Sequence, residues 1–581
     1  MKAHKSYFRR TAIIIASILP AVASTLTPPT AAIAADRLAP WTWTGLYVGG
    51  SAGAAAGTTT FSDPLGASVF GDTVKTSAFL AGLQVGYNWQ VAPRWVVGLQ
   101  GDVSYLESNG SFTCMQPSVT IVGSDCEVSP RVLASLTGRV GLLVDPLGHT
   151  LLYGKGGGAW MDSDVLISRN QTFGNAPATD PSTSVYNTAW GGTVGGGIEH
   201  ALTPAWSVSM EYDYYRFAST NVSTPATVSA PVGIVAVTRV EGGTASVTPD
   251  IQVVKLALNY RWDQNPFAVW ADAPVFAVTA MPVRARPAPI LQGWDVDAGM
   301  RYWYSSGTTK NTTANEGNTA LLSQLTYANS TGQSGEFFAR VDTPWRVFVK
   351  GYIGSGALSG GKNTDEDWGD ATSAKTGFQV TSSTQSGWLN YAAADVGYDV
   401  LHDPRYKLGP FVGYSYFRQN VNALGCNPNV SVGGVCDNIG PNAPFLMQDE
   451  TWQSLRVGVS AVARIWDRWG INGDVAYLPY GQYNGLDTHP QRDPVTFYPQ
   501  GGTSRGVQAE LILTYLLTDS LELGIGGRYW AMWTTSGSQN CFGQCGSPPG
   551  QFVAGGMNPY AASTERFGSF VQASYRFATY P

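Results

Sequence analysis

The chain has 581 residues, of which 13% are charged and 12% aromatic, and it contains 68 glycines. Soluble globular proteins carry roughly 25% charged residues, so a molecule covered on all sides by water is not expected. Acidic residues (41) outnumber basic residues (35), which gives no electrostatic support for a nucleic-acid partner. The glycine and aromatic content is typical of closely packed strands with aromatic girdles at a membrane surface.

Residues 1–34 are predicted to be a signal peptide. Four cations, Lys2, Lys5, Arg9 and Arg10, precede an apolar core between Thr11 and Ser24. The small-residue sequence Ala32-Ile33-Ala34 then provides a cleavage site. The mature chain is therefore expected to be exported.

The remaining sequence contains no uninterrupted apolar run of about 20 residues, so no spanning helix is predicted. Several segments of about ten residues instead alternate between apolar and polar side chains, as in 206–214, 254–262 and 508–517. In the last of these, Leu511 and Leu513 would face one side while Glu510 and Thr514 face the other. A lipid-facing row that alternates with a polar inner row predicts strands of a membrane β-barrel.

The number of such segments predicts an all-β protein with two tandem antiparallel transmembrane β-barrels. The first barrel has eight predicted strands: 45–56, 79–90, 94–105, 133–145, 149–161, 190–201, 205–217 and 252–262. The second has ten: 294–305, 335–343, 345–355, 389–400, 405–418, 451–464, 467–480, 504–517, 520–535 and 564–577. Both numbers are even, as in single-chain bacterial barrels. The predicted domains are 41–262 and 293–581, joined by a proline- and alanine-rich periplasmic linker at 263–292.

The connections between predicted strands alternate in length. Those after even-numbered strands are tight, for example Ala92-Pro93 and Thr518-Asp519, whereas most of those after odd-numbered strands are much longer. Short periplasmic turns and long external loops are typical of outer-membrane barrels. The expected location is the cell outer membrane, with the long loops facing the exterior.

All six cysteines lie in predicted external loops, in three close pairs. Nearest-neighbour disulfides would join Cys114 to Cys126, Cys426 to Cys436 and Cys541 to Cys545, although six cysteines allow fifteen connectivities. A metal site is not expected, because no histidine stands at ligand spacing beside any pair. The expected role of these bonds is to stiffen the loops.

One histidine is placed where it could act at the outer mouth of a barrel. His4 belongs to the signal peptide, and His149, His200 and His402 fall at or next to periplasmic turns, which leaves His489. Residues two apart on an extended chain point the same way, so Asp487 can orient the imidazole and raise its basicity.

A second acidic group lies on another predicted external loop. Asp365 and Asp367 share a face by the same two-residue spacing. Two carboxylates forced together should share a proton near neutral pH and could polarise a water molecule. An acidic run in such a loop is also commonly a solvated turn or a loose calcium site, and a lone Asp-x-His is commonly structural. The residues alone leave these alternatives open.

Together the two motifs resemble the active site of the omptin family, which are ten-stranded outer-membrane endopeptidases. The resemblance covers residues 293–577 and includes Asp365-Glu366-Asp367 followed by Trp368, Asp487-Thr488-His489, Ser306-Gly307 with Lys310, Ser323-Gln324-Leu325, Leu389-Asn390-Tyr391, and Pro404 to Gly409 leading into Gly413-Tyr414. It implies an aspartate/histidine endopeptidase without a cofactor, acting on peptides or proteins at the cell surface. Asp487 and His489 would activate water, and Asp365 and Asp367 would position it or stabilise the oxyanion.

The chain departs from the family at two kinds of position. Asn311 and Gly485 stand where members that cleave between basic residues have acidic side chains, which puts a dibasic preference in doubt. The resemblance also implies outer-membrane lipid and lipopolysaccharide as partners. Of the lipopolysaccharide-binding positions, Tyr414 and Arg418 are kept, while Tyr416 and Thr451 replace an acid and a base. A requirement for lipopolysaccharide in activity is left open.

The first barrel has no comparable motif. Its opening residues 43–50 (WTGLYVGG) and closing residues 258–262 (LNYRW) resemble small eight-stranded outer-membrane proteins, most of which are structural, adhesive or immunogenic. A lumen of eight strands is filled by side chains, so a wide pore is not expected. The alternative to a protease is a non-catalytic surface, adhesive or porin-like structural protein.

Overall fold

The computed structural model describes residues 42–62, 73–113, 124–145, 148–169, 183–203, 205–223, 227–229, 238–240, 244–262, 294–314, 321–368, 378–403, 405–430, 436, 439–465, 468–492, 495–542 and 557–578. The predicted signal peptide and the whole of the predicted linker lie outside these residues. Within the described part of the chain, no helix combines the length and hydropathy needed to cross a membrane.

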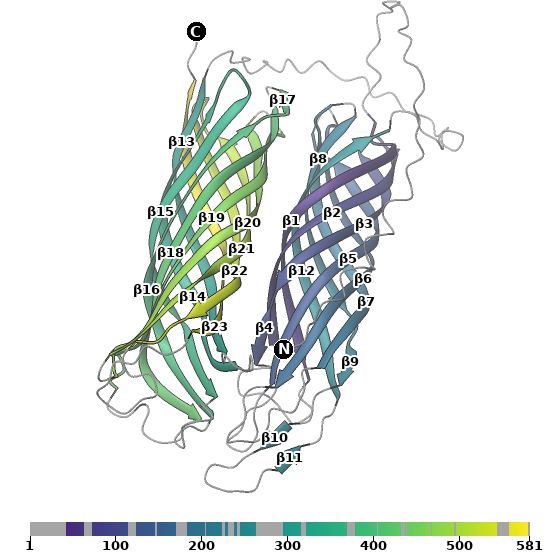
Figure 1. Cartoon of the computed structure of the whole chain (residues 1–581). Coiled ribbons are helices and arrows are strands. Elements are labelled where there is room, and N and C mark those ends of the chain that lie inside the picture. Colours follow the sequence, from purple (N-terminus) through teal and green to yellow (C-terminus); the bar gives the residue numbers. More distant parts are fainter. Residues whose placement is uncertain are drawn as a thin grey trace, which may run out of the picture. The chain divides into compact units, whose positions relative to one another are not determined.

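The first closed barrel is formed by eight long antiparallel strands (Figure 1). In order around the ring they are β1 (Gly45–Phe61), β2 (Thr73–Ala92), β3 (Trp95–Asn109), β5 (Ser124–Leu143), β6 (Thr150–Arg169), β7 (Thr183–Ala201), β8 (Trp206–Phe217) and β12 (Thr244–Arg261). Pairing of β1 with β12 closes the ring. Four short strands lie in the connections between the long strands: β4 (Ser111–Thr113), β9 (Thr220–Ser223), β10 (Thr227–Ser229) and β11 (Thr238–Val240).

The second closed barrel is formed by ten long antiparallel strands (Figure 1). They are β13 (Asp295–Ala314), β14 (Leu321–Asp342), β15 (Val347–Trp368), β16 (Phe378–Tyr398), β18 (Tyr406–Val430), β19 (Pro444–Arg464), β20 (Trp469–His489), β21 (Thr496–Leu516), β22 (Leu521–Gln539) and β23 (Asn558–Ala578). Pairing of β13 with β23 completes the ring, and the short β17 (Leu401–Asp403) forms a hairpin with β18. The predicted fold class and both strand numbers are confirmed.

On β13 and β15 of the second barrel, the apolar outer band ends before the strand does. On β13, Met300, Tyr302 and Tyr304 are exposed, whereas the intervening Arg301 and Trp303 are buried in the lumen. Exposed apolar side chains that alternate with buried polar ones are what a lipid-facing wall requires. On β15, the described outward positions beyond Ile353 are small or polar, namely Ser355, Ala357 and Ser359. The remainder of β15 therefore extends out of the hydrocarbon layer.

Most strands are longer than the sequence predicts, and this corrects the placement of the candidate site. β15 continues to Trp368 instead of ending at residue 355, and β20 continues to His489 instead of residue 480. The acidic pair and the histidine thus lie on strands and not in loops. Hydropathy fails to predict these extensions because outward side chains beyond the lipid do not have to be apolar.

The lumen of the first barrel is filled by a buried network of charges. Lys155 forms ion pairs with Glu211 and, at 3.0 Å, with Asp213, while Arg139 lies 3.0 Å from Glu199. All five side chains are buried. Buried cations matched to buried acids are stable only as a set, because removing one partner leaves an uncompensated charge.

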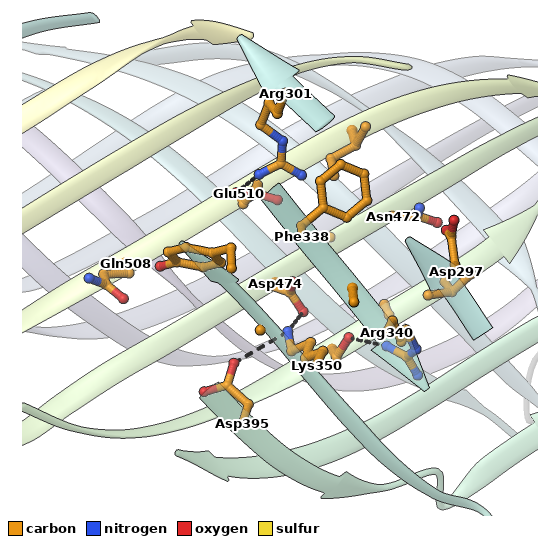
Figure 2. A pocket seen from close by; sticks show the side chains of 18 of the residues that line it. Asp297, Arg301, Phe338, Arg340, Lys350, Asp395, Asn472, Asp474, Gln508 and Glu510 are labelled. Atoms are coloured by element: carbon orange, nitrogen blue, oxygen red, sulfur yellow. Dashed lines mark hydrogen bonds and ion pairs between the residues drawn. The ribbon is translucent and has the colours of Figure 1, made fainter. Parts of the chain in front are cut away.

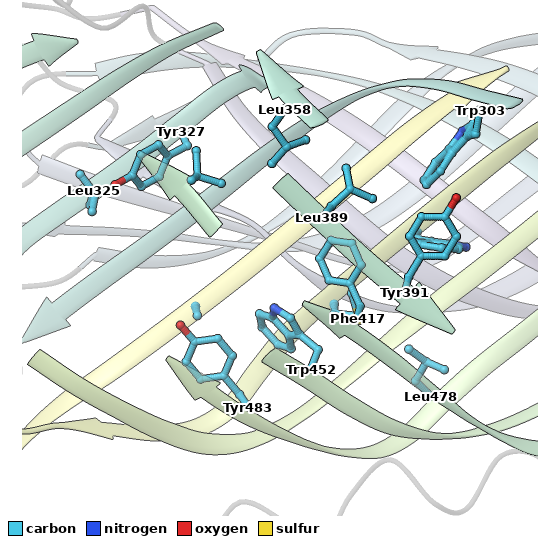
Figure 3. Packing of buried hydrophobic residues seen from close by; sticks show 14 of the residues in the cluster. Trp303, Leu325, Tyr327, Leu358, Leu389, Tyr391, Phe417, Trp452, Leu478 and Tyr483 are labelled. Atoms are coloured by element: carbon cyan, nitrogen blue, oxygen red, sulfur yellow. The ribbon is translucent and has the colours of Figure 1, made fainter. Parts of the chain in front are cut away.

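The lumen of the second barrel has an aromatic layer that includes Trp303, Tyr391 and Phe417 (Figure 3). Trp530 belongs to the same layer. The Trp530 ring lies 4.9 Å from Trp303 and 5.1 Å from Tyr391 between ring centroids. The Arg528 guanidinium packs 4.8 Å from the Trp530 ring centroid. At this level the lumen is filled by side chains.

A charged cavity of about 110 Å³ lies deeper in the same lumen (Figure 2). The ammonium of Lys350 stands between two acids, 2.5 Å from Asp474 and 3.8 Å from Asp395. Lys350 is near the start of β15, and Asp365 is near its end. The cavity and the candidate site therefore occupy opposite ends of the same strands.

Candidate active site

The acidic half of the site is carried by β15. Asn363, Asp365 and Asp367 alternate along the strand and turn into the lumen, where Asp365 is 7% exposed. In the register with β14, Asp365 is opposite Leu325 and Asp367 is opposite Ser323. The Ser323 hydroxyl donates a hydrogen bond to Asp367. Strand pairing on both sides fixes the two carboxyl groups on one wall of the mouth.

The histidine half is carried by the end of β20. Asp487 and His489 face inward by the same two-residue alternation, and His489 Nε2 lies 2.9 Å from Asp487 Oδ2. With Nε2 donating to the carboxylate, Nδ1 keeps a lone pair that can accept a proton. Asp487 is buried, so its charge reaches the ring with little screening by water.

The two halves lie close enough to act on one another electrostatically, although β15 and β20 are not neighbours in the ring. Asp487 acts on both Asp365 and Asp367, and His489 acts on Asp367. Asp365 and Asp367 lie beyond the last exposed apolar side chain of β15, Ile353. The structure thus brings the four predicted site residues together at the mouth of the second barrel.

Burial and crowding of like charges raise the pKa of both acids on β15. The pKa of Asp365 is raised well above its ordinary value, first by burial and then by the charges of Asp367 and Asp487. The pKa of Asp367 is also raised by burial, but the positive charge of Arg492 and an electrostatic contribution from the His489 imidazole oppose the rise. Asp365 is therefore the member of the pair that keeps its proton to the higher pH, and Asp367 ionises more readily.

Two residues of the site were missed in the sequence, Arg492 and Tyr498. Arg492 lies in the turn after β20, and its Nη1 donates a hydrogen bond to the Tyr498 hydroxyl at 2.7 Å. Tyr498 lies opposite Asp487 in the pairing of β20 with β21, and its ring centroid is 5.1 Å from that of His489. No periodicity marks a residue in a turn. Tyr498 could have been found from the sequence by pairing the strand that follows His489 with the strand that carries Asp487. In that hairpin Tyr498 lies opposite Asp487.

Glu450 is a buried acid on β19 below this site. It is 0% exposed, and its Oε1 accepts a hydrogen bond from Gln419 Nε2 at 2.6 Å. The flanking Asp449 and Thr451 are polar and lie on the opposite face of the strand, so this part of β19 is beyond the lipid-facing band. Burial raises the pKa of Glu450 to about 7.

We expect the Glu450→Gln variant to lose a pH dependence of stability that the wild type has. A pKa raised on folding contributes stability that is complete below the unfolded pKa of 4.5 and is lost as the pH rises through about 7. The loss should amount to about 3 kcal/mol in the free energy of unfolding. Urea unfolding in detergent micelles at pH 5 and pH 8 measures it. An Asp449→Asn control should keep the dependence, and an unchanged dependence in Glu450→Gln would contradict the assignment.

Family comparisons divide the chain at the same place as the two barrels. The model described as "Outer membrane protein beta-barrel domain" matches residues 25–261, and the model of the Omptin family matches residues 310–542. The second barrel is omptin-like. The chain lies in the bacterial outer membrane, and the family match of the omptin-like barrel supports a protease there.

Individual relatives are distant. The 31 kDa outer-membrane immunogenic protein of Brucella melitensis is 27% identical over 188 residues, which is 31% of this chain and 74% of the relative. The 22 kDa outer membrane protein of Rhizobium leguminosarum is 28% identical over 177 residues, 30% of this chain and 65% of that protein. The crystal structure of outer membrane protease OmpT from Escherichia coli covers 49% of this chain and 97% of its own, at 17% identity and a TM-score of 0.42.

The positions expected to set specificity are neutral in the omptin-like barrel. Asn311 is buried, and its side-chain amide has no hydrogen-bond partner among the described residues. A side chain at Gly485 would clash with Gln500 Oε1 and with the Tyr483 hydroxyl. Tyr483 and Tyr560 both donate hydrogen bonds to Gln500. Uncharged groups therefore fill the place of an acid at 485.

Tyr414 and Arg418 lie on β18 of the omptin-like barrel and bind other side chains of the barrel. The Tyr414 hydroxyl donates a hydrogen bond to Gln453 at 2.8 Å. Arg418 donates two hydrogen bonds to Asp449, at 3.0 and 2.9 Å. Lipopolysaccharide binding by these two residues remains a prediction.

The disulfide between Cys426 and Cys436 is confirmed, and it connects the end of β18 to the following loop. Cys126 and Cys541 are also disulfide-bonded, while their predicted partners Cys114 and Cys545 lie outside the described residues. Cys126 and Cys426 lie on strands, because β5 and β18 extend further outward than predicted.

Proposed function

We propose that the omptin-like barrel is an aspartate/histidine endopeptidase that cleaves peptides at the cell surface with an activated water molecule. The observation that carries the proposal is the hydrogen-bonded Asp487–His489 dyad interacting with the acidic pair Asp365 and Asp367 at one mouth. A base oriented by a carboxylate and a second, partly protonated acid are the groups that direct hydrolysis of an amide requires.

Each residue has one part in the proposed reaction. His489 Nδ1 takes a proton from water while the water oxygen bonds to the scissile carbonyl carbon, and Asp487 stabilises the imidazolium that forms. Asp367, as a carboxylate, accepts a hydrogen bond from the other O–H of the water. Asp365, as a neutral acid, donates a hydrogen bond to the carbonyl oxygen as it gains negative charge. The C–N bond then breaks as His489 returns its proton to the leaving amine, which gives a carboxylic acid and an amine. Transfer of the acid's proton to the amine leaves a carboxylate and an ammonium group.

The side chains around the mouth favour substrates other than dibasic sequences. Selection of a basic side chain requires a fixed negative charge in the pocket, and the groups at 311 and 485 supply none. Asp365, Asp367 and Asp487 belong to the proposed catalytic set, and Glu450, which lies opposite Gly485 in the strand register, has a pKa raised by burial and so is not a fixed negative charge. We therefore propose peptide or protein substrates without a strict requirement for paired basic residues.

Cleavage in ¹⁸O-labelled water tests the proposed chemistry. The refolded full chain, with and without lipopolysaccharide, is incubated with a mixture of peptides, and the products are analysed by mass spectrometry. We expect new termini whose carboxylate has gained one ¹⁸O atom per cleavage, with no acyl-enzyme trapped by hydroxylamine and no effect of EDTA. Absence of cleavage under both conditions, or a trapped acyl-enzyme, would overturn the proposal.

A further inference from the structure

Arg492 is held over the candidate site by the turn that follows β20. Its backbone N–H donates to the carbonyl of His489 at 3.3 Å, which folds the chain back just after the histidine. Its guanidinium then reaches Tyr498 on β21, where Nη1 binds the hydroxyl at 2.7 Å and Cζ lies 5.8 Å from the ring centroid. Arg492 is therefore held by its backbone at His489 and by its guanidinium at Tyr498.

Tyr498 connects this cation to the histidine. Its ring meets the His489 imidazole edge to face, at an interplanar angle of 62°. The same tyrosine lies opposite Asp487 in the strand register. The hydroxyl holds Arg492 and the ring packs against His489, so one side chain sets the spacing between the guanidinium and the imidazole.

Without Arg492, the acidic groups near the candidate site would outnumber the basic groups. Asp365, Glu366 and Asp367 are on β15, and Asp487 and His489 are on β20. The phenols of Tyr327 on β14 and Tyr498 on β21 also face the cluster. The carboxyl groups of Asp365, Asp367 and Asp487 are buried or half-buried. They cannot all be ionised when the histidine is neutral, because like charges in a low dielectric repel strongly.

Arg492 acts on these acids through space. Among the described residues, no carboxylate lies within 4 Å of its guanidinium, and its side chain has one hydrogen-bond partner, Tyr498. Its positive charge nevertheless lowers the pKa of Asp365 and of Asp367, against the effect of burial.

We propose that Arg492 is a positioning residue that supplies the counter-charge for the acidic cluster, so that the Asp365/Asp367 pair carries one negative charge at neutral pH. Tyr498 holds the guanidinium in place and keeps it at a fixed spacing from His489. This inference rests on the proposed function for its catalytic meaning, but the protonation of the acids can be measured without any turnover. Arg492 and Tyr498 would thus be a third part of the site, beside the Asp487–His489 dyad and the acidic pair. Both residues lie outside the two sequence motifs.

Infrared titration of the protonated carboxyl band tests the counter-charge directly. The band of the pair is assigned by its loss in Asp367→Asn and Asp365→Asn, and its midpoint is compared in wild type, Arg492→Met and Arg492→Lys. We expect the midpoint to rise by about one pH unit in Arg492→Met and to stay near the wild-type value in Arg492→Lys. Arg468, a turn arginine before β20 that donates to the Leu517 carbonyl, provides the matched control Arg468→Met. An unchanged midpoint in Arg492→Met would overturn the inference.

The pH profile of kcat/KM distinguishes this inference from the proposed function. Removal of a positive charge raises the pKa of the acids, so the acidic limb of the Arg492→Met profile should move to higher pH. The expected loss is about tenfold at pH 6 and small at pH 8, with recovery in Arg492→Lys and a smaller shift in Tyr498→Phe. A uniform loss at every pH would mean that Arg492 only supports the fold, and would contradict the counter-charge. A wild type that cleaves nothing would defeat the proposed function, while the infrared midpoint would still decide this inference.

Discussion

The His489→Ala variant is expected to lose peptide cleavage by about 10³-fold in kcat/KM. His489 is placed to accept a proton from the attacking water, and general-base catalysis contributes roughly 10²- to 10⁴-fold. Initial rates on one fluorogenic peptide, measured for wild type and variant refolded in the same lipopolysaccharide micelles, give the ratio. The loss should be in kcat, because the imidazole acts in the transition state and not in binding.

His402→Ala is the matched control for this experiment. His402 lies on β17 in the same barrel, at the end opposite the mouth, with Nδ1 3.6 Å from Asp399. Its removal changes the histidine content without touching the site, and activity should stay within about twofold of the wild type. Equal activity of His489→Ala and His402→Ala would remove His489 from the mechanism.

The two acids of β15 are expected to respond differently to substitution by asparagine. Asp365 is the more strongly protonated of the pair, and an asparagine amide also donates a hydrogen bond, so Asp365→Asn should cost only about tenfold in kcat/KM. Asp367 acts as a carboxylate toward water and His489, and asparagine cannot replace its charge. Asp367→Asn should therefore cost about 10³-fold, a loss typical of removing one group that stabilises the transition state.

The prediction is tested by which of the two variants loses more kcat/KM. Both variants keep the size of the side chain, and strand pairing with β14 and β16 holds both positions. Circular dichroism and the shift in gel mobility on heating check that each variant has folded. A larger loss in Asp365→Asn than in Asp367→Asn would reverse the assigned protonation and refute the mechanism in its present form.

The parts of the fold in contact with lipid could be predicted from the sequence, because lipid imposes a strict alternation on them. Met300, Tyr302 and Tyr304 show it, with Arg301 and Trp303 between them. Beyond the lipid the same strands continue with polar residues on both faces, as at the end of β15. No hydropathy change marks where such a strand ends, so the predicted loops were too long.

The candidate site also has a part that could be predicted from the sequence and a part that could not. Asp365 with Asp367 and Asp487 with His489 follow the two-residue repeat of a strand, and this repeat survives the change from predicted loop to observed strand. Arg492 belongs to a turn and acts through Tyr498 across a hairpin. A contact of this kind depends on the register between β20 and β21, which the sequence alone does not state.

The central claim is that the acidic pair and the histidine dyad form one catalytic unit, and a double-mutant cycle in kcat/KM tests it most directly. The four proteins are wild type, His489→Ala, Asp367→Asn and the double variant, assayed on one peptide at one pH. If both groups act on the same water molecule, the double variant should be about as slow as the slower single variant, because residues of a catalytic unit are strongly non-additive. Losses that multiply, or single variants as active as the wild type, would contradict the claim that these residues form a single active site.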